Sequence, residues 1–111
     1  MYALFFQFHI PVAGREKMAV EVFNDAMMTF GKWAAEGLCH EPLAFISNRG
    51  GGVILLPGDH EAKLWELIHT DEFYEMVTKA RLTDPKLDWQ LMAPATELMP
   101  KWAEVVMQTL P

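Results

Sequence analysis

The order in which apolar patterns follow one another is the feature that most constrains this chain's fold. Alternating apolar residues indicate strands, and apolar residues repeating every three or four positions indicate helices. The predicted order is strand, helix, strand, strand, helix, strand and a terminal helix, which we expect to start near Pro100 because a first helical turn tolerates proline. The strands cover residues 2–10, 42–48, 53–56 and 87–93, and the helices cover 15–36, 61–68, 71–82 and 100–110.

Turn and cap residues mark the ends of these segments. Gly37 follows the first long helix, where a left-handed residue commonly ends a helix. Asp59 is predicted to cap the helix that follows it, and Thr70 or Asp71 is predicted to cap the restart after a break at residues 69–71. Residues 48–52, rich in glycine, are predicted to form a hairpin loop.

This element order is the split βαβ pattern of ferredoxin-like α+β folds. It predicts one domain over residues 1–111, with a four-stranded antiparallel sheet, two main helices on one face and an uncovered second face. About 56% of the residues are apolar when glycine is counted and tyrosine is not, against ~45–50% in typical domains. A small domain cannot hide that excess within itself, so we expect a buried subunit interface, a ligand cavity, or both.

The charge balance excludes several functions. The net charge is −6 and no two Lys or Arg residues are adjacent, which argues against partners such as nucleic acid or anionic lipid. Cys39 is the single cysteine, so we expect no internal disulfide and a cytoplasmic location. Residues 1–10 lack the basic start of a signal peptide, and no apolar run approaches the ~18–20 residues of a membrane span.

The element order over about residues 1–95 resembles the dimeric α+β barrel superfamily. That superfamily includes antibiotic-biosynthesis-type monooxygenases and stress-responsive barrel proteins. The broken second helix, His69-Thr70-Asp71-Glu72-Phe73-Tyr74-Glu75, resembles a polar and acidic stretch followed by Phe or Tyr that many members have there. The resemblance implies a homodimer whose sheets pair face to face, with a ligand pocket inside the barrel or between sheet and helices. It transfers no catalytic residue to this chain.

The first strand supplies the main candidate site. Its even positions from Tyr2 to Ile10 are all apolar, whereas its odd positions are mixed. If the even side packs under the helices, the mixed side faces the barrel interior. His9 would then act as a base on a phenolic or enolic substrate, with Asp88 orienting it. The other expected substrate-binding residues of these two strands are Phe5, Gln7, Gln90 and Met92.

Each candidate has a structural alternative. His9 can simply end the strand and bond to water or to a partner chain. His69, a further candidate for substrate binding, can belong to an ordinary helix restart. Cys39, His40 and Glu41 are adjacent and cannot all point at one ion, so we expect no metal. We expect no cofactor either, although haem binding, detectable as a Soret band, is a third reading.

The sequence therefore predicts a homodimeric barrel that binds a small apolar or aromatic molecule. If it is an enzyme, we expect a cofactor-independent oxygenase or isomerase acting on an aromatic or enolic compound. The alternative is a non-catalytic binding or stress-associated module whose interior is filled by Phe5, Met92 and their neighbours. Cavity volume separates the two, since a ligand site needs a cleft of several hundred cubic ångströms reaching His9.

Overall fold

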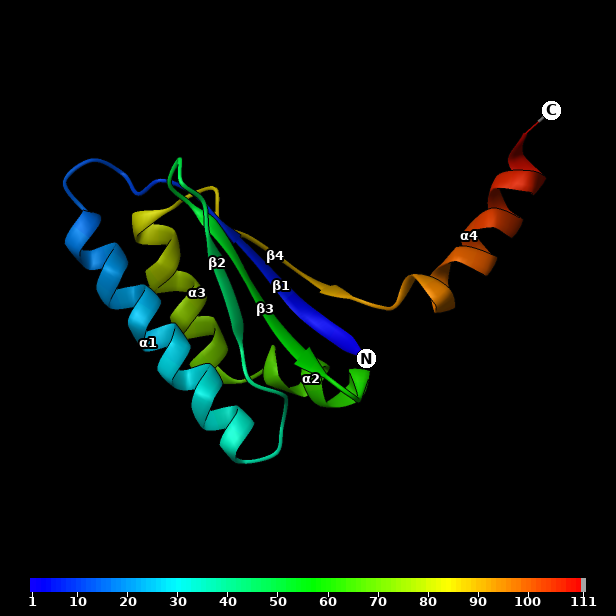
Figure 1. Cartoon of the computed structure of the whole chain (residues 1–111), viewed down its shortest axis with the longest axis horizontal. Helices are drawn as coiled ribbons and strands as arrows, with labels where there is room; N and C mark the ends of the chain where they lie inside the picture. The colour runs from blue at the N-terminus through cyan, green and yellow to red at the C-terminus, as the bar shows by residue number, and fades with distance from the viewer. Residues whose placement is uncertain (111) are drawn as a thin grey trace.

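Four antiparallel strands form one sheet with the order β2-β3-β1-β4 in the computed structural model, which describes residues 1–110 (Figure 1). This is the predicted ferredoxin-like α+β arrangement. Figure 1 shows α1 and α3 side by side on one side of the sheet. The elements are β1 (Tyr2–Phe8), α1 (Glu16–Ala35), β2 (Leu43–Ile46), β3 (Gly52–Gly58), α2 (Glu61–Leu67), α3 (Asp71–Thr83), β4 (Asp88–Met92) and α4 (Ala95–Thr109).

The core lies between the sheet and the helices that cover it. β1 is central and pairs with β3 and β4, and its side chains Leu4 and Phe6 are buried. The Phe6 ring lies 5.3 Å from the Phe30 ring of α1 and 6.0 Å from the Phe73 ring of α3. These contacts join both helices to the central strand. They confirm that the even-numbered side of β1 is the side under the helices.

No described element covers the other face of the sheet. The strand register places Phe5 opposite Leu55 on one side and Gln90 on the other. At the edges of this face, Phe45 is 59% exposed and Met92 is 45% exposed. An open face that is apolar at its edges is the bare surface that the element order predicts.

The helix ends confirm some of the predicted caps and correct one. Gly37 follows α1 with φ 78°, and the Thr70 hydroxyl accepts a hydrogen bond from the Phe73 backbone N–H at 3.2 Å. The predicted cap at Asp59 is wrong, because α2 starts one residue too late for it and the N-cap position is His60. The Asp59 carboxylate instead lies 2.9 Å from His40 Nε2.

The terminal helix starts earlier than predicted. α4 begins at Ala95, directly after Pro94, so the expected start near Pro100 is wrong and Pro100 lies inside the helix. A proline there has no N–H to offer the carbonyl four residues earlier. Pro94, with φ −58°, already sets a backbone angle suited to a helix start.

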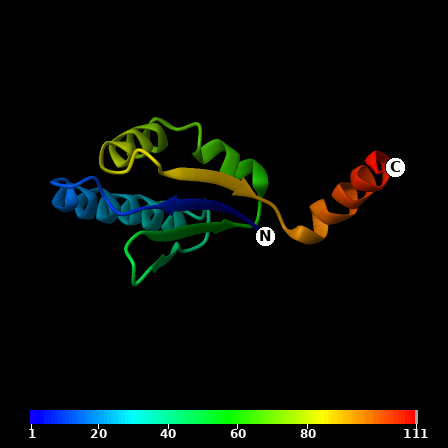
Figure 2. The ribbon, with the colours of Figure 1, turned by 90° about the horizontal axis from the view of Figure 1, so that it is seen from above.

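α4 forms an arm that leaves the body of the protein (Figures 1 and 2). The radius of gyration is 16.1 Å, against about 13 Å for a compact chain of this size. None of the fifteen described residues of α4 is buried. At its first turn, the Tyr2 hydroxyl donates to the Glu97 carboxylate, with oxygen–oxygen distances of 2.8 and 3.0 Å.

Candidate functional site

A cavity of about 430 Å³ lies between the sheet and the two long helices. Its walls are aromatic and aliphatic, because the apolar stripes of α1 and α3 both face β1 there. Wall residues from β1, α1 and α3 include Phe6, Phe8, Phe23, Ala26, Met76 and Ala80. The volume falls in the range of small-molecule sites, which are mostly apolar with a few placed polar groups.

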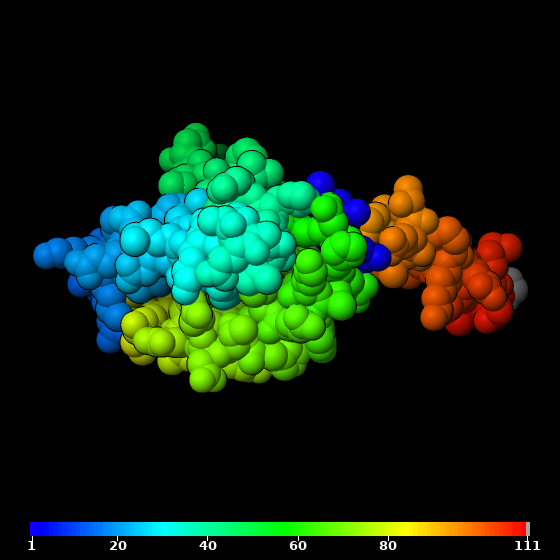
Figure 3. Space-filling view, turned by 90° about the horizontal axis from the view of Figure 1, so that it is seen from below, coloured from blue at the N-terminus to red at the C-terminus, as the bar shows by residue number. Residues whose placement is uncertain are grey.

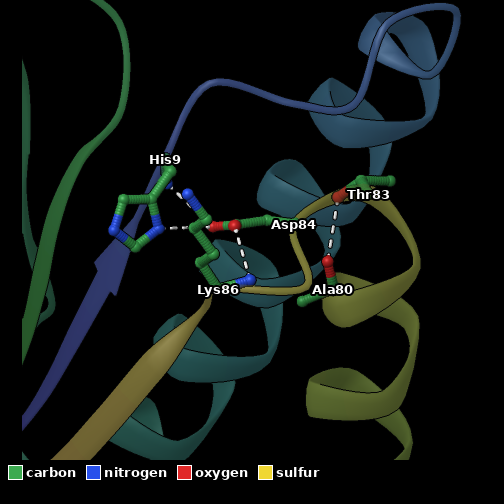
Figure 4. Close-up of polar contacts among 5 residues, drawn as sticks. All are labelled: His9, Ala80, Thr83, Asp84 and Lys86. Carbon is green, nitrogen blue, oxygen red and sulfur yellow. Dashed lines mark hydrogen bonds and ion pairs between the residues drawn. The ribbon is translucent and has the colours of Figure 1, made fainter.

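The polar groups gather at one end of this cavity, around His9 and Asp84 (Figure 4). Asp84 is only 5% exposed, although it carries a carboxylate. Its Oδ2 accepts the His9 backbone N–H at 2.7 Å and lies 3.2 Å from His9 Nδ1. Its Oδ1 accepts the Lys86 backbone N–H at 3.1 Å. The buried carboxylate is therefore fully used by three donors from two segments.

Local sequence explains why these segments meet. α3 ends at Thr83, and Pro85 follows Asp84, so the chain turns there before β4. The Thr83 carbonyl accepts the Val12 backbone N–H at 2.8 Å, which fastens the β1–α1 connector to the end of α3. His9 lies on that same connector. The position of His9 is therefore fixed by its own backbone bond to Asp84 and by the bond from Val12 to Thr83 three residues later.

This arrangement gives the imidazole a defined tautomer. An ionised carboxylate can only accept hydrogen bonds, so His9 carries its proton on Nδ1 when it bonds to Asp84. Nε2 then has a free lone pair and can accept a proton. The His9 side chain is 39% exposed, and the residue lines both the cavity and a second, more open hollow. A ligand in either space can reach it.

The other residues expected around His9 are divided between the second hollow and the open face of the sheet. Gln7 lines the second hollow together with His9. The remaining residues of the set share the open face of the sheet, where Gln7 pairs with Asp88 and Phe5 pairs with Gln90 in the register. Met92 pairs with Ala3 on the same face.

The carboxylate beside His9 is Asp84 and not Asp88. β1 ends at Phe8, so strict strand alternation stops before His9. His9 lies just beyond the strand, where it borders both the cavity under the helices and the hollow that Gln7 also lines. Asp84 stands next to Pro85 in a short connection, and nothing in the sequence marks its carboxylate as buried.

His69 lines neither of these two spaces. It lies at the break between α2 and α3, where its Nδ1 is 2.7 Å from the Trp65 carbonyl and its ring is 5.0 Å from the Trp65 ring. Both contacts are local. The Thr70 cap explains why a new helix, α3, starts directly after the break.

Cys39 carries no activated thiol. It is partly buried, and this burial, helped by the nearby Glu41 carboxylate, raises the pKa of the Cys39 thiol to about 11. His40, the next residue, forms an exposed pair with Asp59, and the hydrogen bond from His40 lowers the pKa of Asp59. Across residues 1–110, no three His, Cys, Asp or Glu side chains are grouped so that they could hold a metal ion. No helix among these residues is long and apolar enough to span a membrane.

No protein-family model and no curated protein matches this chain. Solved structures do match it. An antibiotic biosynthesis monooxygenase superposes with a TM-score of 0.67 at 16% identity, over 85% of this chain and 98% of that one. SnoaB from Streptomyces nogalater, a cofactor-independent oxygenase, gives 0.62 at 10%, over 84% and 92%.

A dimeric ferredoxin-like protein of unknown function from Jannaschia sp. gives a TM-score of 0.61 at 10% identity, over 85% of this chain and all (100%) of that one. All three identities are low, so these likenesses concern the fold. The chain shares the ferredoxin-like α+β fold of these three proteins.

Proposed function

We propose that this protein binds a small, flat, largely apolar molecule in the cavity between the sheet and the helices α1 and α3. The supporting observation is a cavity of about 430 Å³ whose apolar walls end at one polar pair, His9 and Asp84. Such a space with one polar end suits an aromatic ring that carries a hydroxyl group. A cavity of this size at His9 favours a ligand site over a module with a filled interior.

The reaction that this site supports best is oxidation of a phenol or an enol without a cofactor. His9 Nε2 removes the hydroxyl proton, and the Asp84 carboxylate stabilises the imidazolium that forms. The resulting anion is electron-rich and reduces dioxygen, the oxidant. One oxygen atom enters the substrate as a carbonyl, and the other leaves as water with the two displaced hydrogens. SnoaB, a cofactor-independent oxygenase of the same fold, is a precedent for oxygenation without a cofactor.

An isomerase is the second candidate that the same geometry favours. Proton transfer by His9 from one carbon of an enolic compound to another needs no oxidant. Dioxygen uptake separates the two reactions, because only the oxygenase consumes it.

We also propose that the protein is a homodimer whose open sheet faces pack together. On this face Leu43 is 50% exposed and Phe45 is 59% exposed. Neighbouring apolar side chains that are exposed in this way commonly mark a surface that binds another protein. The dimeric ferredoxin-like protein from Jannaschia offers a precedent for self-association of this fold.

The test of the ligand site uses two probes, 1-naphthol and naphthalene, with the full chain. We expect both to bind in calorimetry, and only 1-naphthol to cause dioxygen uptake in an oxygen electrode. His9→Gln should bind naphthalene as the wild type does and should lose at least 10²-fold in uptake. Asp88→Asn, a change on the open face, serves as the control. Uptake that is unchanged in His9→Gln would exclude His9 as the base, and failure of both probes to bind would argue against the cavity as the site.

A further inference from the structure

The arm helix α4 is amphipathic and has no partner for its apolar side. Its polar residues fall on one stripe at helical spacing: Glu97, Lys101, Glu104 and Gln108. The opposite side carries the apolar residues Met99, Trp102 and Val106, and Met99 is 50% exposed and Trp102 is 62% exposed to solvent. A helix face of this kind is normally buried against another element.

The contact at the base of the arm turns this apolar side away from its own body. Glu97 belongs to the polar stripe, and it bonds to Tyr2 at the start of β1. The side opposite Glu97 therefore looks outward at the first turns of α4. Figure 3 shows the whole arm standing clear of the rest of the chain.

In the proposed homodimer the arm cannot cover the β2 edge of its own chain, because the path to that edge crosses the open sheet face that the second copy occupies. α4 follows β4 after two residues, Ala93 and Pro94. The exposed edge strand β2 lies at the opposite side of the sheet, roughly 14 Å away at ~4.8 Å per strand. Covering its own β2 would require α4 to cross the whole sheet face.

A second copy brings that edge within reach. When two such sheets pack face to face about a two-fold axis parallel to the strands, the order β2-β3-β1-β4 places β2 of one copy over β4 of the other. All four residues of β2 are exposed, and Leu43, Phe45 and Ile46 form an apolar edge. Proteins commonly protect such an edge by covering it with a helix.

The two sheet faces alone bury too little surface for a stable dimer. A four-stranded face of about 19 by 20 Å presents roughly 400 Å², whereas a stable interface takes about 800 Å² from each partner. A fifteen-residue helix is about 22 Å long and ~10 Å wide. In a symmetric dimer each copy buries one face of its own helix and an equal area under the helix of its partner. These two contacts add about 400 Å² of buried surface per copy.

We propose that α4 is an exchanged arm: in the homodimer its apolar side, centred on Trp102 and Val106, covers the β2 edge of a second copy. This rests on the proposed self-association and adds to it the surface that makes the association stable. The two-fold symmetry applies the contact twice, so each copy both gives an arm and receives one.

Two variants that each add a carboxylate, on opposite sides of the arm, test this. Val106→Glu places the carboxylate in the apolar face, and Gln108→Glu places it in the polar stripe. In sedimentation over a dilution series, we expect Val106→Glu to raise the dimer dissociation constant at least tenfold and Gln108→Glu to change it less than twofold. Circular dichroism checks that both retain the fold. A dimer equally stable in both variants overturns the arm contact.

A photo-crosslinking amino acid in place of Trp102 identifies the covered surface. Mixing isotope-labelled and unlabelled copies separates links between copies from links within one. We expect links between copies that map to residues 43–46. Links within one copy, links to another surface, or binding of the arm to neutral phosphatidylcholine vesicles would each overturn the proposal. A chain that is monomeric at all concentrations would defeat the proposed homodimer itself, whereas a dimer without these links would defeat the arm alone.

Discussion

A single carboxylate oxygen of Asp84 serves both the backbone and the ring of His9. Oδ2 lies 2.7 Å from the His9 backbone nitrogen and 3.2 Å from its Nδ1. The backbone bond holds the connector in place, and the ring bond sets the tautomer. One buried group thus links the stability of the β1–α1 connector to the chemistry of the candidate site.

Asp84→Ala should destabilise the fold. It leaves the His9 and Lys86 backbone N–H groups without their acceptor, and a lost partner in a buried position costs about 1–3 kcal/mol. Urea denaturation measures the free energy of unfolding. Glu21→Ala is the control, because Glu21 is exposed on α1, away from the open sheet face, and its removal should change stability by less than ~0.5 kcal/mol. Equal effects of the two would show that the Asp84 bonds contribute nothing.

Ala80→Leu should block the cavity without unfolding the chain. Ala80 lines the cavity from α3, and leucine is also a good helix former. We expect at least a tenfold loss of naphthalene affinity in calorimetry, with a melting temperature at or above that of the wild type. Thr78→Leu, on the exposed side of α3, should leave the affinity unchanged. Unchanged affinity in Ala80→Leu would place the ligand elsewhere.

Two glycines should respond to alanine with opposite signs. Gly31 lies inside α1 with open space around a new Cβ, so Gly31→Ala should stabilise by about 1 kcal/mol. Gly51 has φ +72°, and a Cβ there would lie 2.6 Å from the Phe8 carbonyl oxygen. Gly51→Ala should therefore destabilise by about 1–3 kcal/mol. Thermal and urea unfolding of both variants give the comparison, and a stable Gly51→Ala protein would contradict the hairpin geometry.

Cys39 should react slowly with iodoacetamide at neutral pH. Only the thiolate reacts, and a pKa of about 11 in place of 9.0 leaves about a hundredfold less thiolate at pH 8. The rate should rise about tenfold per pH unit up to pH 10. Because the folded pKa is raised, the stability from the buried thiol is full below pH 9 and is lost as pH rises towards 11. Alkylation of native and urea-unfolded protein, followed by mass spectrometry, checks this, and equal rates at pH 8 would contradict it.

Phe5→Glu should dissociate the proposed homodimer. It places a charge in the middle of the open sheet face, opposite Leu55 and Gln90. Sedimentation should show mainly monomer at concentrations where the wild type is dimeric. Met28→Glu makes a similar change at an exposed apolar residue of α1 and should leave the dimer intact. A dimer that survives Phe5→Glu would mean that another surface holds the copies together.

Periodicity and hydrogen bonds between near neighbours were enough to predict the element order and a helix restart capped by Thr70 or Asp71. They placed the start of the last helix at Pro100 instead of Ala95, since two prolines near each other offer two starts. The packing of distant segments was needed to choose between the two faces of β1, and to bring His9, just beyond the end of that strand, against Asp84, 75 residues away. That pairing arises where the end of α3 packs on the β1–α1 connector, and no local pattern records which distant carboxylate will be buried there. The cavity has the same origin: the stripes of α1 and α3 are visible in the sequence, but the space left between them and β1 depends on how the elements pack.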